Sequence, residues 1–203
     1  MNIQDIWQYG ENHKMFIEQL PLTSNSAELL AAATELITQH HGVWEKMHQL
    51  CLTHKQDSTD IWLDGTGSLV DRTTNIRRAQ EWDFNLWNID STHPIRQQIE
   101  LLSTHLDNIK FGRIRIMRLL PKTGLSVHKD KELRYHLVLK TNPRAYIAHE
   151  TADLDPTRST LPTTAACYHL PNNNHWFRID TRETHWVYNG GNEERIHLVV
   201  CGI

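Results

Sequence analysis

Four residues in the C-terminal half have the types and the spacing for metal and anion chemistry. His128 and Asp130 lie two positions apart, so in an extended backbone both side chains point to one face, roughly 6.5 to 7 Å apart. His185 opens a later apolar segment, and Arg195 follows it by ten residues. The set therefore offers two imidazoles, one carboxylate and one guanidinium.

Two imidazoles and a carboxylate on one face of an octahedral ion leave three positions open, which is the arrangement of non-haem Fe(II) oxygenases. A 2-oxoglutarate co-substrate would chelate that iron and needs a bidentate arginine for its far carboxylate. We therefore expect His128, Asp130 and His185 to be the metal ligands and the catalytic centre, with Fe(II), 2-oxoglutarate and O2 as cofactors. His-x-Asp alone is also typical of a solvated strand end.

These side chains must be positioned by strands, and the chain becomes β-like from Phe111 onward. Alternating and β-branched runs recur at short intervals, separated by turn-rich pieces. The predicted strands are 111–120, 133–140, 144–149, 165–170, 175–180, 184–188 and 194–201. The segment 151–164 reads as a long surface loop, and a lid is one function open to it.

The N-terminal half has helical patterns instead. Apolar stripes predict helices at 24–41, 43–55 and 94–107. We expect one compact domain, in which a helical region, 1–110, supports a β-rich catalytic core, 111–203.

The composition excludes several other classes of protein. A net charge of -3 does not favour a nucleic-acid partner, and three scattered cysteines fit neither a disulfide framework nor a zinc site. No apolar run has membrane-spanning length, and no signal peptide is evident at the start. We expect a cytoplasmic protein with a small-molecule or peptide substrate and no membrane partner.

The ordered motifs of residues 111–203 resemble the catalytic domain of the aspartyl/asparaginyl β-hydroxylase family of Fe(II)/2-oxoglutarate dioxygenases. The matching residues are His128, the run Leu133-Arg134-Tyr135-His136-Leu137, Phe177 and Asp180 ahead of His185, and Arg195. The resemblance implies a double-stranded β-helix, a cupin-like jelly roll, with His128 and His185 as iron ligands. It also implies that Arg195 binds the far carboxylate of 2-oxoglutarate, and that Arg134 and His136 line the same pocket.

Two positions depart from the family pattern. Animal members use two histidines and no carboxylate, whereas Asp130 is available here, as in bacterial proline cis-hydroxylase relatives. Asp130 favours a complete triad and argues against halogenation. Met117 stands where the family often has a serine that helps to bind the co-substrate. Arg113 or Arg115, on the same strand face, could compensate or bind substrate.

The expected activity is hydroxylation of a C–H bond in an amino acid, a peptide side chain or a small metabolite. Two alternatives stay open, namely a cupin-fold metal-binding protein without 2-oxoglutarate chemistry and a non-catalytic ligand-binding module. Trp186, next to His185, is the best aromatic candidate for the cavity wall.

Other polar groups are expected at the surface. They are His149, Glu150 and Asp153, with the arginines 113, 115, 118, 144 and 158.

Overall fold

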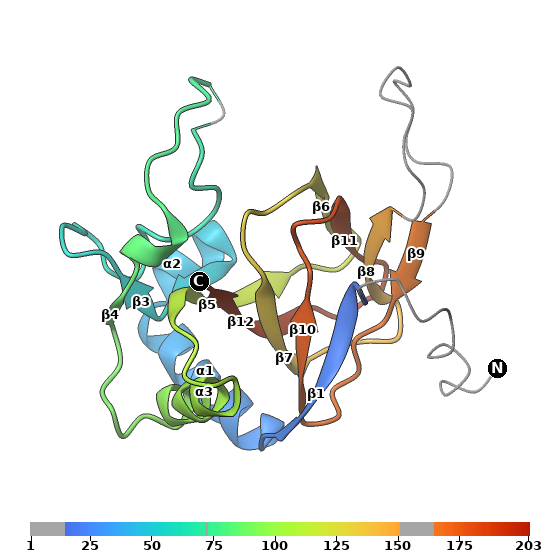
Figure 1. Ribbon diagram of the computed structural model, residues 1–203, viewed down its shortest axis with the longest axis horizontal. Coiled ribbons are helices and arrows are strands. Elements are labelled where there is room, and N and C mark those ends of the chain that lie inside the picture. The colour runs from blue at the N-terminus through green and yellow to red at the C-terminus, as the bar shows by residue number, and fades with distance from the viewer. Residues whose placement is uncertain (1–14, 72, 151–164) are drawn as a thin grey trace.

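A computed structural model describes residues 15–71, 73–150 and 165–203, and its centre is a pair of facing antiparallel sheets (Figure 1). The eight strands of the core divide between the sheets, in the order β10-β7-β12-β5 in one and β6-β11-β8-β9 in the other, and successive strands change sheet except at β8 and β9, which pair with each other. The strands are β5 (Phe111–Leu119), β6 (Thr123–His128), β7 (Arg134–Lys140), β8 (Ala145–Glu150), β9 (Ala165–Tyr168), β10 (His175–Ile179), β11 (His185–Asn189) and β12 (Arg195–Gly202). The predicted double-stranded β-helix is therefore confirmed.

The N-terminal half contributes strands as well as helices. β1 (Ile17–Thr23) pairs with β10, and β2 (Gln49–Cys51) pairs with β5, which makes the larger sheet six-stranded. β3 (Thr53–His54) and β4 (Leu86–Trp87) form a separate small ribbon. The helix predicted at 43–55 is wrong beyond its first part. α2 (His41–Met47) ends there because His48 adopts a left-handed conformation, φ 56°, and the chain then enters β2.

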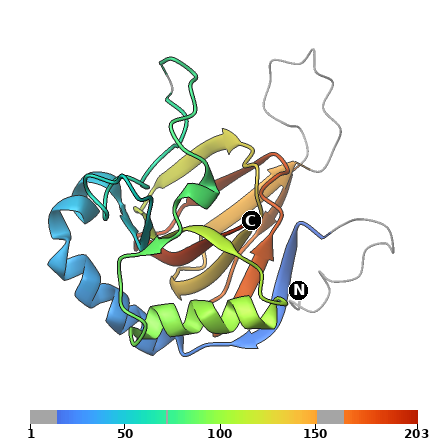
Figure 2. The ribbon, with the colours of Figure 1, turned by 60° about the vertical axis from the view of Figure 1, so that its left-hand side comes forward.

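Two longer helices cover one face of the six-stranded sheet. α1 (Ser26–Gln39) and α3 (Pro94–His105) lie on one side of it, and the four-stranded sheet lies on the other (Figures 1 and 2). The apolar stripes predicted from the sequence point inward, with Leu29 and Ala33 of α1 and Ile99 of α3 buried. Among the helices of the described ranges, none has the length and hydropathy that a membrane crossing needs.

Strand alternation separates the two faces of the six-stranded sheet. Tyr135, Leu137 and Leu139 of β7 pack against the helices, while Val138 packs in the apolar layer between the sheets. Arg134 and His136 share that inner face with Val138. The predicted polar site residues of β7 therefore lie inside the double-stranded β-helix, as their spacing indicates.

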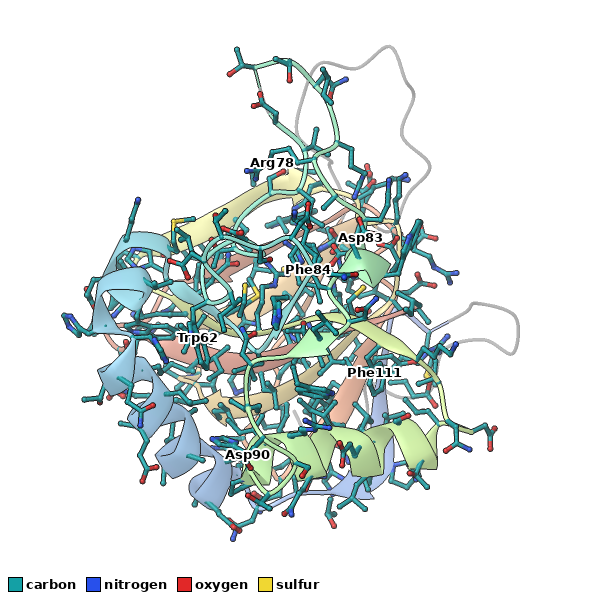
Figure 3. The ribbon with its side chains drawn as sticks, turned by 90° about the vertical axis from the view of Figure 1, so that its left-hand side faces the viewer. Trp62, Arg78, Asp83, Phe84, Asp90 and Phe111 are labelled. Carbon is teal, nitrogen blue, oxygen red and sulfur yellow. The ribbon has the colours of Figure 1, made fainter. Side chains whose placement is uncertain are left out.

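A short 3-10 helix, η2 (Glu81–Asp83), lies against β5. Figure 3 shows this region with Asp83 and Phe84 labelled, and Phe84 is completely buried. Gly112 of β5 permits the contact, because a Cβ there would lie 2.3 Å from the Glu81 carbonyl oxygen. The absence of a side chain at Gly112 thus brings η2 and its Glu81 close to the sheet.

Candidate metal centre

The pairing of β6 with β11 brings His128 and His185 together. The two residues are directly opposite each other, and their ring centroids are 4.3 Å apart. The next pair is Leu125 opposite Val187. Between these two pairs β6 advances by three residues while β11 advances by two. This β-bulge turns His128 to the inner face, and bulges commonly re-aim side chains next to active sites.

The backbone sets the tautomer of both imidazoles. Nδ1 of His128 lies 2.6 Å from the carbonyl oxygen of Ser126, and Nδ1 of His185 lies 2.9 Å from that of Glu183. A carbonyl oxygen only accepts, so each Nδ1 carries the hydrogen and each Nε2 keeps a lone pair. This is the usual way in which proteins orient histidines that ligate metals.

Asp130 supplies the carboxylate from the loop after β6 rather than from the strand itself. Its backbone N–H donates to the Thr181 carbonyl oxygen at 2.8 Å, which ties this loop to the one before β11. One ligand atom from each of His128, Asp130 and His185 falls within 4.8 Å of the others. These donors fit a divalent ion such as Fe(II), held on one side and open on the other.

Arg134 braces the carboxylate of Asp130. Its Nε lies 3.4 Å from Asp130 Oδ2, which leaves Oδ1 for a metal. Its Nη2 donates to Glu81 Oε1 at 2.8 Å. Burial lowers the pKa of Arg134, but Asp130 and Glu81 outweigh it and the pKa is raised. Arg134 therefore remains charged and holds one oxygen of the Asp130 carboxylate.

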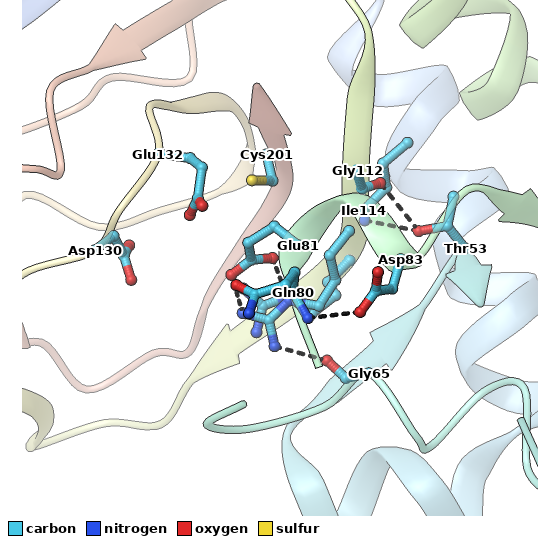
Figure 4. A network of polar contacts seen from close by, with 12 residues as sticks. Thr53, Gly65, Gln80, Glu81, Asp83, Gly112, Ile114, Asp130, Glu132 and Cys201 are labelled. Atoms are coloured by element: carbon cyan, nitrogen blue, oxygen red, sulfur yellow. Dashed lines mark hydrogen bonds and ion pairs between the residues drawn. The ribbon is translucent and has the colours of Figure 1, made fainter. Parts of the chain in front are cut away.

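Glu81 is the centre of a buried charge cluster (Figure 4). Arg113 donates to both of its carboxylate oxygens at 2.8 Å, and Arg134 adds a third bond. Burial raises the pKa of Glu81, but the charges of Arg113 and Arg134 more than compensate and lower it to about 2. Sequence patterns did not indicate this residue, although it links η2 to the candidate metal ligands through Arg134.

A second group of possible ligands, Glu81, Glu132 and Cys201, also lies within 4.8 Å. Both oxygens of Glu81 are already bonded to arginines. Burial raises the pKa of the Cys201 thiol to about 12 and also raises the pKa of Glu132, so neither favours the ionised form that binds metal. This group is better explained as part of the charge cluster.

Arg195 is a buried cation at the start of β12. Burial lowers its pKa to about 10, and it remains protonated at neutral pH. Its Nε donates to His197 Nε2 at 2.9 Å, and His197 Nδ1 lies 3.2 Å from His136 Nδ1. Burial lowers the pKa values of His136 and His197 well below the usual value of histidine, so both imidazoles are neutral. Among the described residues, Arg195 forms no ion pair with a carboxylate, so its buried charge is available to an anion.

Aromatic rings beside His185 close another wall of the site. His149 lies directly opposite His185 on β8 and stacks on Phe16, with ring centroids 4.1 Å apart. Phe16 is 6.4 Å from the ring of His185, and Tyr168 lies beyond His149. His149 is half-buried, so the surface position expected for it holds only in part. No sequence pattern pointed to Phe16, because it reaches the site only when β1 pairs with β10.

Trp186 does not take the role predicted for it. It follows His185 in β11, so strand alternation turns it to the opposite face of the sheet, where it is only half-buried. Phe16 occupies the position beside the ligand instead.

The expected exposure of the arginines is also partly wrong. Arg113 and Arg115 are buried, at 5 % and 6 % exposure. Arg118 lies over the ring of Trp44 and pairs with Glu45, while Arg144 is exposed as predicted. Asp153, Arg158 and the predicted loop 151–164 lie outside the described residues.

A cavity of about 530 Å³ lies elsewhere, between α3, the β3–β4 ribbon and the start of β5. Its lining includes Trp82, Trp87, Ile99, Phe111 and Ile203. None of the six predicted site residues lines this cavity, so it is separate from the candidate metal centre.

Comparisons with known proteins bear on the family and on the fold. The sequence profile described as Aspartyl/Asparaginyl beta-hydroxylase matches residues 86–202, and a search of curated proteins gave no match. The fold is similar to AviO1 from Streptomyces viridochromogenes, at 13 % identity over 92 % of this chain and 88 % of that one, with a TM-score of 0.54. It is also similar to the non-heme alpha ketoglutarate dependent epimerase SnoN from nogalamycin biosynthesis, at 11 % identity over 93 % and 77 %, with a TM-score of 0.50. At these identities the structural likeness concerns the fold.

Proposed function

The chain belongs to the aspartyl/asparaginyl beta-hydroxylase family, and from this we infer that it hydroxylates a C–H bond of an amino acid, a peptide side chain or a small metabolite. It is a non-haem Fe(II)/2-oxoglutarate-dependent oxygenase, and succinate and CO2 are the proposed co-products. The observation that carries the proposal is the convergence of His128, Asp130 and His185, each with one donor atom available.

The residues of the chain have separate proposed tasks. His128, Asp130 and His185 would hold Fe(II), and Arg195 would bind the far carboxylate of 2-oxoglutarate, with His136 and Arg134 lining the same pocket. Bound iron, 2-oxoglutarate and O2 would supply the oxidising chemistry. Arg195 is buried, and the interaction of its charge with an anion would be stronger there than in water.

The test is an anaerobic titration with Fe(II) and 2-oxoglutarate. We expect a weak visible charge-transfer band in the wild type, and succinate once O2 and a substrate are added. His185→Ala should lower iron affinity by at least about 100-fold, because even partners outside the ligand set are worth 10- to 100-fold.

The matched control is His41→Ala, which removes a histidine whose side chain is 72 % exposed. It should bind iron as the wild type does. Iron binding without any effect of 2-oxoglutarate would favour the alternative, a cupin-fold metal protein that does not use this co-substrate. Retained turnover in His185→Ala would remove the assignment.

A further inference from the structure

The cavity of about 530 Å³ between α3, the β3–β4 ribbon and the start of β5 has the composition of a ligand pocket. Its volume is within the range of small-molecule sites, roughly 300 to 1,000 Å³. Its floor is apolar, because Ile99 of α3 and Ile114 of β5 line it and are almost completely buried. Asn85, Ser103 and Asn108 add polar groups to the lining. A few polar groups around an apolar floor are typical of sites that orient a small molecule.

The six-stranded sheet separates this cavity from the candidate metal centre. Ile114 belongs to the apolar layer between the sheet and the helices, whereas Arg134 and His136 lie on the opposite, inner face. The proposed metal ligands come from β6, β11 and the loop after β6, which lie beyond that inner face. A molecule in the cavity is therefore not the one that would be oxidised at the metal.

Three aromatic rings line the cavity. Two of them, Trp82 of η2 and Trp87 of β4, form no ring contact with another aromatic side chain of the described residues, and Trp82 is 49 % exposed. Arg96 covers one face of the Trp87 indole, at 4.9 Å from the ring centroid. Phe111, labelled in Figure 3, already has an edge contact with Tyr135. Aromatic rings pair by offset stacking or edge-to-face contact, so the two unpaired indoles favour a ligand with a flat ring.

Charge favours an anionic group on the same ligand. Of the two charged side chains that line the cavity, Glu100 is already paired, since its Oε1 lies 2.8 Å from Arg96 Nε. The exposed Lys110 ammonium forms no ion pair with a carboxylate of residues 15–71, 73–150 or 165–203. The lining therefore offers one uncommitted cation, which attracts a negative group.

We propose that this cavity is a second ligand site, for a small molecule that combines a flat aromatic ring with a carboxylate. The ring packs against the indoles of Trp82 and Trp87, and the carboxylate pairs with the ammonium of Lys110. Trp82 and Glu81 are neighbours in η2, so the ligand also contacts the 3-10 helix that contributes Glu81 to the buried charge cluster. Binding at this site requires neither a metal ion nor 2-oxoglutarate.

The experiment titrates the metal-free protein with two matched pairs of probes. Indole-3-acetate and indole-3-acetamide share a ring and differ in charge, whereas phenylacetate and cyclohexylacetate share the charge and differ in aromaticity. Isothermal titration calorimetry gives each affinity, and the shift in thermal unfolding temperature checks it. The variants are Trp82→Leu and Lys110→Gln. Their controls are Trp186→Leu and Lys46→Gln, which remove an indole and a lysine that do not line the cavity.

In wild type, indole-3-acetate should bind about threefold more tightly than its amide at low ionic strength, as expected for an exposed ion pair. Phenylacetate should bind about threefold more tightly than cyclohexylacetate, because only the aromatic ring gains ring–ring contacts. Trp82→Leu should weaken indole-3-acetate about tenfold, since it removes both the ring contact and apolar area. Lys110→Gln should abolish the preference for the acid over the amide. The two control variants should bind all four probes as wild type does.

The side chains of Trp82 and Lys110 are exposed, so both variants should fold, with unfolding temperatures close to that of wild type. Absence of saturable binding of indole-3-acetate up to about 10 mM would overturn the proposal. Unchanged affinity in Trp82→Leu would place the probe elsewhere, and an unchanged acid preference in Lys110→Gln would exclude the ion pair. Equal binding of phenylacetate and cyclohexylacetate would exclude a site for aromatic rings. Because no metal is present, failure of the proposed iron chemistry would not alter any of these results.

Discussion

At the scale of single residues, Arg134 connects the candidate metal centre to the N-terminal half of the chain. It contacts Asp130 on one side and Glu81 on the other. Glu81 itself precedes the residues that match the family profile, 86–202. These contacts imply that the geometry of Asp130 depends on a residue far from it in sequence.

We predict that Glu81→Gln destabilises the protein by about 3 to 5 kcal/mol, because Arg113 and Arg134 lose their buried partner. Iron affinity should fall several-fold, since Arg134 is then less firmly held against Asp130. Urea unfolding and Fe(II) titration measure the two effects. The control is Glu100→Gln, which removes an exposed partner of Arg96 and should cost no more than about 1 kcal/mol. Unchanged iron affinity in folded Glu81→Gln would show that Arg134 holds Asp130 without it.

Arg195→Met tests the co-substrate pocket. The variant should raise the 2-oxoglutarate concentration for half-saturation by at least about 30-fold, about 2 kcal/mol, because a charge-assisted pair is lost. Iron affinity should change by less than about twofold. The exposed Arg144 provides the control, since Arg144→Met should leave both constants unchanged. A normal requirement for 2-oxoglutarate in Arg195→Met would exclude the proposed role.

At the scale of elements, the site depends on where two strands end. β6 ends at His128 and β11 begins at His185, so the two imidazoles meet at one edge of the four-stranded sheet. In a regular strand His128 would point to the face opposite to that of Leu125. The bulge in β6 brings His128 to the same face as His185. The loop after β6 then returns Asp130 to the same edge.

The contact of η2 with β5 can be tested through Gly112. Gly112→Ala would place a Cβ 2.3 Å from the Glu81 carbonyl oxygen, so η2 must move. We expect a loss of about 1 to 3 kcal/mol in unfolding free energy, as for other overpacked sites, together with weaker iron binding. Gly42→Ala is the control, because nothing lies within 4 Å of its Cβ and alanine favours the α2 helix. Normal iron affinity in Gly112→Ala would show that the position of η2 does not affect the metal centre.

At the scale of the whole molecule, the N-terminal half completes the sheet and the charge cluster. β1 and β2 add strands at its two edges, α1 and α3 cover its outer face, and η2 brings Glu81 to the inner one. We propose on this basis that residues 1–110 support the core of 111–203 within one compact unit.

The buried ionisable groups predict a stability that falls with acid in two stages. His136 and His197 have pKa values well below 6.5 in the fold, so unfolding binds protons and stability declines below about pH 6.5. Glu81, at about 2 against 4.5 when unfolded, contributes of order 3 kcal/mol above pH 4.5, which is lost as the pH falls toward 2. Urea unfolding between pH 7 and 2.5 measures both stages. Glu81→Gln should lose the second stage alone, and an identical pH profile in that variant would contradict the assignment.

Much of this protein was predictable from sequence, because local periodicity reports which face a side chain occupies. The stripes of α1 and α3, most strands after Phe111 and the inner position of Arg134 and His136 follow from spacing alone. The order of His128, Asp130, His185 and Arg195 likewise indicated the chemistry before any contact was known.

Tertiary structure alone decided the rest, because burial depends on what packs over a residue and not on its neighbours in sequence. β6 is exposed along most of its length, so no hydrophobic pattern predicted it. Arg113 and Arg115 alternate like solvated residues and are buried only because β2 and η2 fold against β5. Phe16 contacts His185 and Glu81 contacts Arg113, and each pair is more than 30 residues apart in sequence. Local sequence patterns cannot predict such contacts.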